Sequence, residues 1–120
     1  FVQKHPKIAW VNYPGLEGDK YHDLAQKYMP KGTCGVVTFG VKGGRKAAET
    51  FMAGLKLASI ATHVADAKTC VLHPASSTHR QLSEAELAAA GVSADLIRLS
   101  VGIEDITDIL ADLEQALDQV

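Results

Sequence analysis

The sequence lacks the features that mark several broad classes of protein. No apolar run approaches the roughly 18 residues that a membrane-spanning helix needs, so we expect a soluble chain with no membrane partner. The net charge is only −2 and the basic residues are scattered, so no nucleic-acid partner is expected. The opening stretch FVQKHPKIAW has neither an initiator methionine nor the basic and apolar regions of a secretion signal. We therefore expect more sequence ahead of Phe1.

Cysteine is also scarce. Cys34 and Cys70 are the only two, which is too few for a disulfide-dense scaffold. Both lie in apolar, strand-like segments, and this context predicts two buried free thiols. Free thiols in turn favour a reducing, cytoplasmic compartment.

What the sequence does contain is enough material for one folded domain. Its 120 residues, of which 47% are hydrophobic and 22% charged, fit a single globular unit. Strand and helix signals alternate, with no internal repeat or linker. Strands are predicted at about 7–13, 35–41, 59–64, 69–73 and 96–101, and helices at about 21–29, 43–57, 83–91 and 104–117.

Two of the helices have clear boundary signals. Ser83 and Glu86 form an S-x-x-E capping box, and Gly91 suits a left-handed helix end. In the last helix, apolar residues recur at helical spacing from Ile106 to Leu117. No predicted strand is a long apolar run like those of a doubly covered parallel sheet. The pattern predicts a two-layer α+β domain, with a small, mainly antiparallel sheet and helices on one face.

Most residues with chemical potential fit no catalytic or metal-binding motif. The five histidines form no compact ligand spacing, so no metal site is predicted. His73, just before Pro74, is interpreted as hydrogen-bonded to loop backbone. The G-x-S-x-G motif is absent, so no serine nucleophile is indicated. The glycine pair in VKGGRK matches neither phosphate-binding motif and is interpreted as a tight turn.

Arg98 is the exception, because it interrupts an apolar strand. Strand alternation places Ile97 and Leu99 on one face and Arg98 on the other. If the first face meets the helices, the guanidinium projects where an open site can lie, and its planar fork suits a carboxylate. The alternative is an arginine on a solvated or edge face, paired with a neighbouring acid. The residues alone favour this alternative.

Long ordered motifs then connect the chain to a known family. The segments HPASSTH and LIRLSVGIEDITDILADLEQAL, with HPKIAWVNYPGL and GVVTFGVKGG upstream, resemble the C-terminal end of the Cys/Met-metabolism pyridoxal-phosphate enzymes. The resemblance covers nearly the whole chain and is strongest to the O-acetylhomoserine sulfhydrylase branch.

The resemblance implies a fold and a domain organisation. Residues 1–120 are expected to form the smaller C-terminal domain of a fold-type I pyridoxal-phosphate enzyme. The larger N-terminal domain, which binds the cofactor and carries the Schiff-base lysine, is absent from this segment. None of the nine lysines here lies in that lysine's motif, so no catalytic or cofactor-binding residue is assigned and the segment alone is expected to be inactive. The full-length family members are expected to be cytoplasmic homotetramers.

The resemblance also assigns two substrate-binding residues. Arg98 falls on the family's arginine in R-[LIV]-S-x-G, which implies that it binds the α-carboxylate of the amino-acid substrate. His63 stands where the family usually has Ser or Asn, and its imidazole could donate one hydrogen bond to that carboxylate.

The reaction implied is a γ-replacement in methionine biosynthesis. The acetate of O-acetyl-L-homoserine is replaced by sulfide or a thiol, giving homocysteine or methionine. Two alternatives remain open. One is a methionine or cystathionine γ-lyase or γ-synthase of the same family, and the other is a free-standing small-ligand-binding module.

Overall fold

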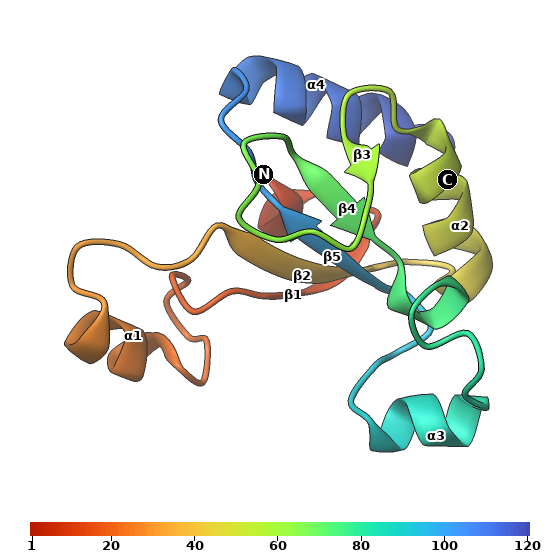
Figure 1. Ribbon diagram of the computed structural model, residues 1–120, viewed down its shortest axis with the longest axis horizontal. Helices are drawn as coiled ribbons and strands as arrows, with labels where there is room; N and C mark the ends of the chain where they lie inside the picture. The colour runs from red at the N-terminus through yellow and green to blue at the C-terminus, as the bar shows by residue number, and fades with distance from the viewer.

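A five-stranded sheet forms the centre of the computed structural model, which describes all of residues 1–120. The strands are β1 (Ile8–Asn12), β2 (Val36–Val41), β3 (Ser59–Ile60), β4 (Cys70–Leu72) and β5 (Leu96–Ser100). They lie in the order β1-β2-β5-β4-β3, and only the β3–β4 pair is parallel (Figure 1). The predicted small, mainly antiparallel sheet is therefore confirmed.

The helices divide into two groups. Helices α2 (Gly44–Gly54) and α4 (Ile106–Leu117) pack together over one face of the sheet, whereas α1 (His22–Tyr28) and α3 (Glu84–Ala89) project from it (Figure 1). Two short 3₁₀ turns, η1 (Val2–Lys4) and η2 (Pro74–Ser76), complete the chain. The structure contains no helix with the length and apolar character required to span a membrane.

The core lies between the sheet and the α2–α4 layer. Phe39 of β2 faces Ile97 across the β2–β5 pair, and both are fully buried. The Phe39 ring meets the Phe51 ring of α2 edge-on, with 5.8 Å between ring centroids. Leu113 and Leu117 add the apolar stripe of α4 to the same cluster. Each such buried side chain contributes roughly 1.5–3 kcal/mol relative to an exposed one.

Asp112 joins the two helices of this layer. Its carboxylate accepts hydrogen bonds from the backbone amides of Lys56, Leu57 and Ala58, at 2.8–2.9 Å. Burial raises the pKa of Asp112, but the amide donors, Ala58 foremost, outweigh burial and leave the pKa below its usual value. The Asp112 carboxylate thus accepts the hydrogen bonds of the backbone amides that follow the end of α2.

Three details of the sequence prediction are wrong. The helix predicted to reach residue 57 ends at Gly54, because Asp112 holds the next amides in a non-helical conformation. The strand predicted over 59–64 stops at Ile60, where the chain leaves the sheet edge. Cys34 is exposed rather than buried because it precedes the start of β2 at Val36, whereas Cys70 in β4 is buried as predicted.

Candidate functional site

Arg98 lies at the middle of the central strand. Its cross-strand neighbours are Thr38 on β2 and Leu72 on β4. Ile97 and Leu99 point into the helix-covered core and are buried, as alternation predicts. Arg98 is half-buried on the opposite face, which we call the open face.

The guanidinium of Arg98 is incompletely satisfied. Nη2 donates a 2.8 Å hydrogen bond to the backbone carbonyl of Thr62 and a long one, 3.5 Å, to that of His63. The buried Nε has no hydrogen-bond partner in the chain. No acid pairs with Arg98, because the two ion pairs of the structure are His5–Glu114 and His63–Asp66. The structure therefore does not support an edge arginine paired with a neighbouring acid.

An unpaired buried donor is unfavourable. Such a group costs about 1–3 kcal/mol when left unsatisfied, and a charged group costs more. A ligand carboxylate can accept two parallel hydrogen bonds from a guanidinium and neutralise its charge. The unpaired Nε is the feature of Arg98 that fits a ligand of this kind.

The segment that meets Arg98 is the loop of residues 61–68, which crosses the open face. Its Ala65 amide donates to Ser100 Oγ at 3.0 Å, and the Ala67 carbonyl accepts from the Ile103 amide. Ala65 has φ +57°, a left-handed conformation that is uncommon for alanine. The loop is thus held by two contacts just after the point where the Thr62 and His63 carbonyls reach Arg98.

A second fixed point follows the loop. Glu104 accepts hydrogen bonds from the amide and the hydroxyl of Thr69, both at 2.7 Å. These two bonds, the backbone one first, lower the pKa of Glu104. The Thr69 hydroxyl also accepts from the Gly102 amide. The loop end is therefore fastened to the chain that follows β5.

His63 lies near Arg98 through its backbone, not through the imidazole to which the family resemblance gives a role. Its backbone carbonyl is the atom near Arg98, whereas its imidazole is 70% exposed, with Nδ1 3.7 Å from Asp66 Oδ2. A hydrogen bond from the imidazole to a substrate carboxylate stays a prediction. Sequence reasoning missed the Thr62 carbonyl, because no side-chain pattern identifies a backbone acceptor.

A polar hollow of about 400 Å³ lies beside this loop. Its lining consists of five polar residues, Thr62, Ser77, Thr78, Arg80 and Gln81. Thr62 belongs both to the hollow and to the Arg98 contact, so the two features adjoin. His73, which lies a few residues before Ser77, is buried. It makes the predicted backbone contact, with its Nε2 2.8 Å from the Ala94 carbonyl.

No lysine of the chain lies in the setting expected of a Schiff-base lysine. A Schiff-base lysine needs a desolvated setting that favours the neutral amine, and none of the nine lysines is buried. Lys7, which is half-buried, donates to the Leu117 carbonyl instead. The residues present suit a substrate carboxylate rather than the cofactor itself.

Comparison with known proteins places the chain in a family. The model of the Cys/Met metabolism PLP-dependent enzymes matches residues 1–118. The chain belongs to this family. The resemblance found in the sequence motifs is thereby confirmed, and with it the family's dependence on pyridoxal phosphate.

Individual relatives agree with the family assignment. The chain is 51% identical to the O-acetyl-L-homoserine sulfhydrylase of Leptospira meyeri over 100% of its own length and 27% of the relative's. It is 51% identical to the homocysteine synthase of Schizosaccharomyces pombe, over 98% of the chain and 28% of that protein. The chain therefore spans little more than a quarter of the curated relatives it matches.

A solved structure confirms the fold. The O-acetylhomoserine (thiol)-lyase chain from Campylobacter jejuni superposes with a TM-score of 0.89 at 41% identity, covering 98% of this chain and 28% of that one. That crystal structure contains a pyridoxyl-lysine phosphate. The α+β architecture of residues 1–120 is thus that of a segment of a fold-type I pyridoxal-phosphate enzyme.

Proposed function

We propose that this chain is the C-terminal, substrate-carboxylate-binding domain of an O-acetyl-L-homoserine sulfhydrylase. The observation that carries the proposal is Arg98, a central-strand arginine with a buried, unpaired Nε and no acidic partner. The relatives named sulfhydrylase and homocysteine synthase support the choice of substrate. The whole enzyme would replace the acetate of O-acetyl-L-homoserine by sulfide or a thiol, giving homocysteine or methionine.

In this proposal Arg98 acts by positioning. Its guanidinium binds the α-carboxylate of the substrate, and the paired strands β2 and β4 on either side keep its backbone fixed. The Thr62 carbonyl holds Nη2, so less of the arginine's rotational freedom is lost on binding. Orienting a substrate in this way can supply a large part of a rate enhancement. When bound, pyridoxal phosphate supplies the electron sink for the reaction.

We further propose that the cofactor and its Schiff-base lysine belong to a larger domain that precedes Phe1. The short span of the chain on its relatives and the absence of a buried lysine support this organisation. By the same family resemblance, the full-length enzyme would be a cytoplasmic homotetramer. The two free cysteines are consistent with a reducing compartment. Light scattering on the full-length enzyme tests the tetramer.

The test of the reaction uses the full-length enzyme with two separate substrates. With O-acetyl-L-homoserine and sulfide we expect homocysteine and acetate, and with methionine alone we expect little α-ketobutyrate. Release of α-ketobutyrate from methionine, with no homocysteine from the first mixture, would instead identify a γ-lyase. Failure of the enzyme to act on any amino acid, together with a start codon just before Phe1, would favour a free-standing binding module.

A further inference from the structure

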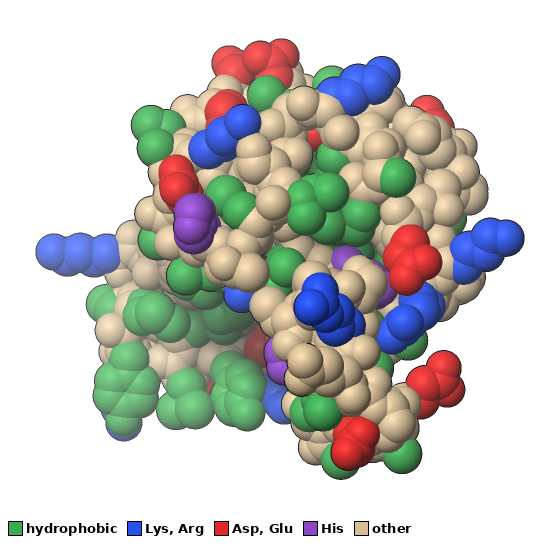
Figure 2. Space-filling view, turned by 45° about the vertical axis from the view of Figure 1, so that its right-hand side comes forward, with side chains coloured by type: hydrophobic (Ala, Val, Ile, Leu, Met, Phe, Trp, Pro, Cys, Tyr) green, Lys and Arg blue, Asp and Glu red, His purple; other side chains and the backbone are tan.

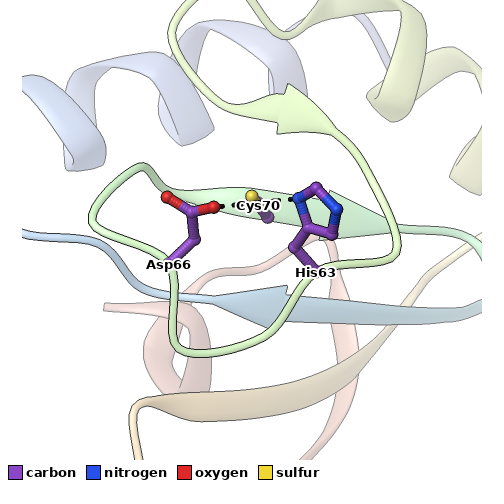
Figure 3. A group of neighbouring side chains, drawn as sticks. All are labelled: His63, Asp66 and Cys70. Carbon is purple, nitrogen blue, oxygen red and sulfur yellow. Dashed lines mark ion pairs between the residues drawn. The ribbon is translucent and has the colours of Figure 1, made fainter.

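Three side chains converge on the open face, and one of them is the histidine that the family resemblance links to the substrate. They are His63 and Asp66 from the 61–68 loop and Cys70 from β4 (Figure 3). One ligand atom from each, an imidazole nitrogen, a carboxylate oxygen and the thiol sulfur, lies within 4.8 Å of the other two. We propose that these three residues form a binding site for a divalent transition-metal ion of the zinc type.

The sheet register explains how Cys70 comes to face the loop. Cys70 pairs with Ser100 across the β4–β5 ladder, and Leu72 pairs with Arg98. Residues two apart on a strand share a face, so Cys70 and Ser100 lie on the same open face as Arg98. The 61–68 loop crosses this face and donates its Ala65 amide to Ser100. This contact brings His63 and Asp66 over the buried sulfur.

The distances require little movement for coordination. His63 Nδ1 and Asp66 Oδ2 are 3.7 Å apart. In a tetrahedral zinc site, metal–ligand lengths of about 2.0–2.3 Å place neighbouring ligand atoms about 3.3–3.7 Å apart. The widest separation in the group, within 4.8 Å, must therefore close by about 1 Å. Because His63 and Asp66 are exposed, their side chains can rotate to supply this closure.

The remaining contacts leave the ligand atoms free for a metal. Asp66 uses Oδ1 to accept the Lys68 amide at 3.0 Å, and this bond orients Oδ2 toward His63. The Cys70 thiol donates a weak hydrogen bond to the Lys68 carbonyl at 3.3 Å. Metal binding would replace that bond, releasing the thiol proton to solvent and leaving the thiolate as the ligand.

The donor set selects the kind of ion. A thiolate with an imidazole and one carboxylate suits zinc and related transition metals, whereas calcium and magnesium prefer sites made of oxygen ligands. The thiolate and the carboxylate together balance the charge of a divalent ion. Three protein ligands leave a fourth position for water or another small ligand. In sequence the site is H-x₂-D-x₃-C, a spacing that a search for paired histidines does not detect.

The test measures zinc binding by the full-length protein after treatment with a chelator. Wild-type protein is titrated with Zn²⁺ against a chromophoric chelator, and with Co²⁺ to observe the thiolate-to-metal absorption band. We expect one ion per chain that depends on these residues. Asp66→Asn and His63→Asn should each raise the Kd by at least about 10-fold, and Cys70→Ala should abolish the Co²⁺ band.

Matched variants separate the site from general effects. Cys34→Ser alters the other free thiol, and His79→Asn alters another loop histidine; both should retain the wild-type Kd and Co²⁺ band. Because His63 and Asp66 are exposed, their variants keep the test valid even if replacing the buried Cys70 prevents folding. A Kd unchanged in both exposed variants would overturn the proposal. So would a Co²⁺ band that persists without Cys70 or disappears without Cys34.

Discussion

The two faces of the sheet differ in how completely their side chains are buried or hydrogen-bonded within this chain. On the helix-covered face, Phe39, Phe51 and Ile97 are fully buried against one another and the α2–α4 layer. On the open face, Arg98 has a buried donor without a partner. Hydrophobic side chains also gather over the projecting α1 arm, at the lower left of Figure 2, where Tyr28 is 69% exposed. Alternate residues of one strand thus build the core on one side and present a guanidinium with an unpaired donor on the other.

The largest predicted effect is on the covered face. Phe51→Ala should lower the free energy of unfolding by about 3–5 kcal/mol, because it removes a fully buried ring that contacts Phe39. Urea denaturation of the full-length protein, followed by a signal from this domain, measures the change. The control is Tyr28→Ala on the exposed arm, for which we expect a change within about 0.5 kcal/mol. Equal effects of the two variants would contradict the contrast between the regions.

The next effect belongs to the open face and concerns activity. In the full-length enzyme, Arg98→Ala should raise the transition-state barrier by about 2–3 kcal/mol, a fall in kcat/KM of about 30- to 160-fold, because it leaves the substrate carboxylate unpaired. Arg98→Lys should not restore activity fully, since it lacks the planar fork. Steady-state kinetics with O-acetyl-L-homoserine provide the measurement.

Arg45→Ala is the matched control for Arg98. Arg45 also donates to a backbone carbonyl, that of Ala75, but it lies in the first turn of α2, in the helix layer rather than on the open face. We expect kcat/KM to stay within about twofold of wild type in this variant, an energy change below about 0.5 kcal/mol. If Arg98→Ala left kcat/KM equally unchanged, Arg98 would not belong to the substrate site.

A smaller effect, on the covered side, depends on pH. At neutral pH Asp112→Asn should cost about 1–3 kcal/mol of stability, because the amide side chain cannot replace a carboxylate that accepts three backbone donors. The pKa of Asp112 is lowered by folding, so its contribution is complete above the unfolded pKa of about 3.9. The contribution is lost as the pH falls from there through the folded pKa.

Denaturation of wild type and Asp112→Asn from pH 7 to pH 3 measures this dependence. The stability difference should be constant near neutrality and shrink in the acid range. The other groups whose pKa values are lowered, Glu86, Glu104 and Asp105, are present in both proteins and cancel in the difference. Asp118→Asn, an exposed change at the C-cap of the same helix, should shift stability by no more than about 0.5 kcal/mol at any of these pH values. A difference that grows on acidification would reverse the assigned sign.

The covered face could be predicted from the sequence and the open face only partly. Strand alternation around Ile97 and the helical stripe ending at Leu117 depend on local periodicity, which the sequence displays directly. The same alternation correctly placed Arg98 opposite the core. It could not indicate that the Thr62 carbonyl meets the guanidinium or that Cys70 lies beneath His63. Those contacts depend on the path of a loop, which hydrogen bonds distant in sequence determine.

The smallest predicted effect concerns the projecting helix α3, whose capping box the sequence predicted. Ser83 Oγ accepts the Glu86 amide, and the Glu86 carboxylate accepts the Ser83 amide at 2.8 Å. Ser83→Ala should cost α3 about 1 kcal/mol, since one of its first amides loses its acceptor. Because α3 packs at the periphery, the loss should appear as faster amide hydrogen exchange at Glu86 and Leu87, with the global unfolding midpoint nearly unchanged. The exposed Ser93→Ala, outside the helix, should leave that exchange unaltered. Equal exchange in both variants would mean that α3 opens only together with the sheet. Helix α3 would then belong to the same cooperative unit as the helix-covered face.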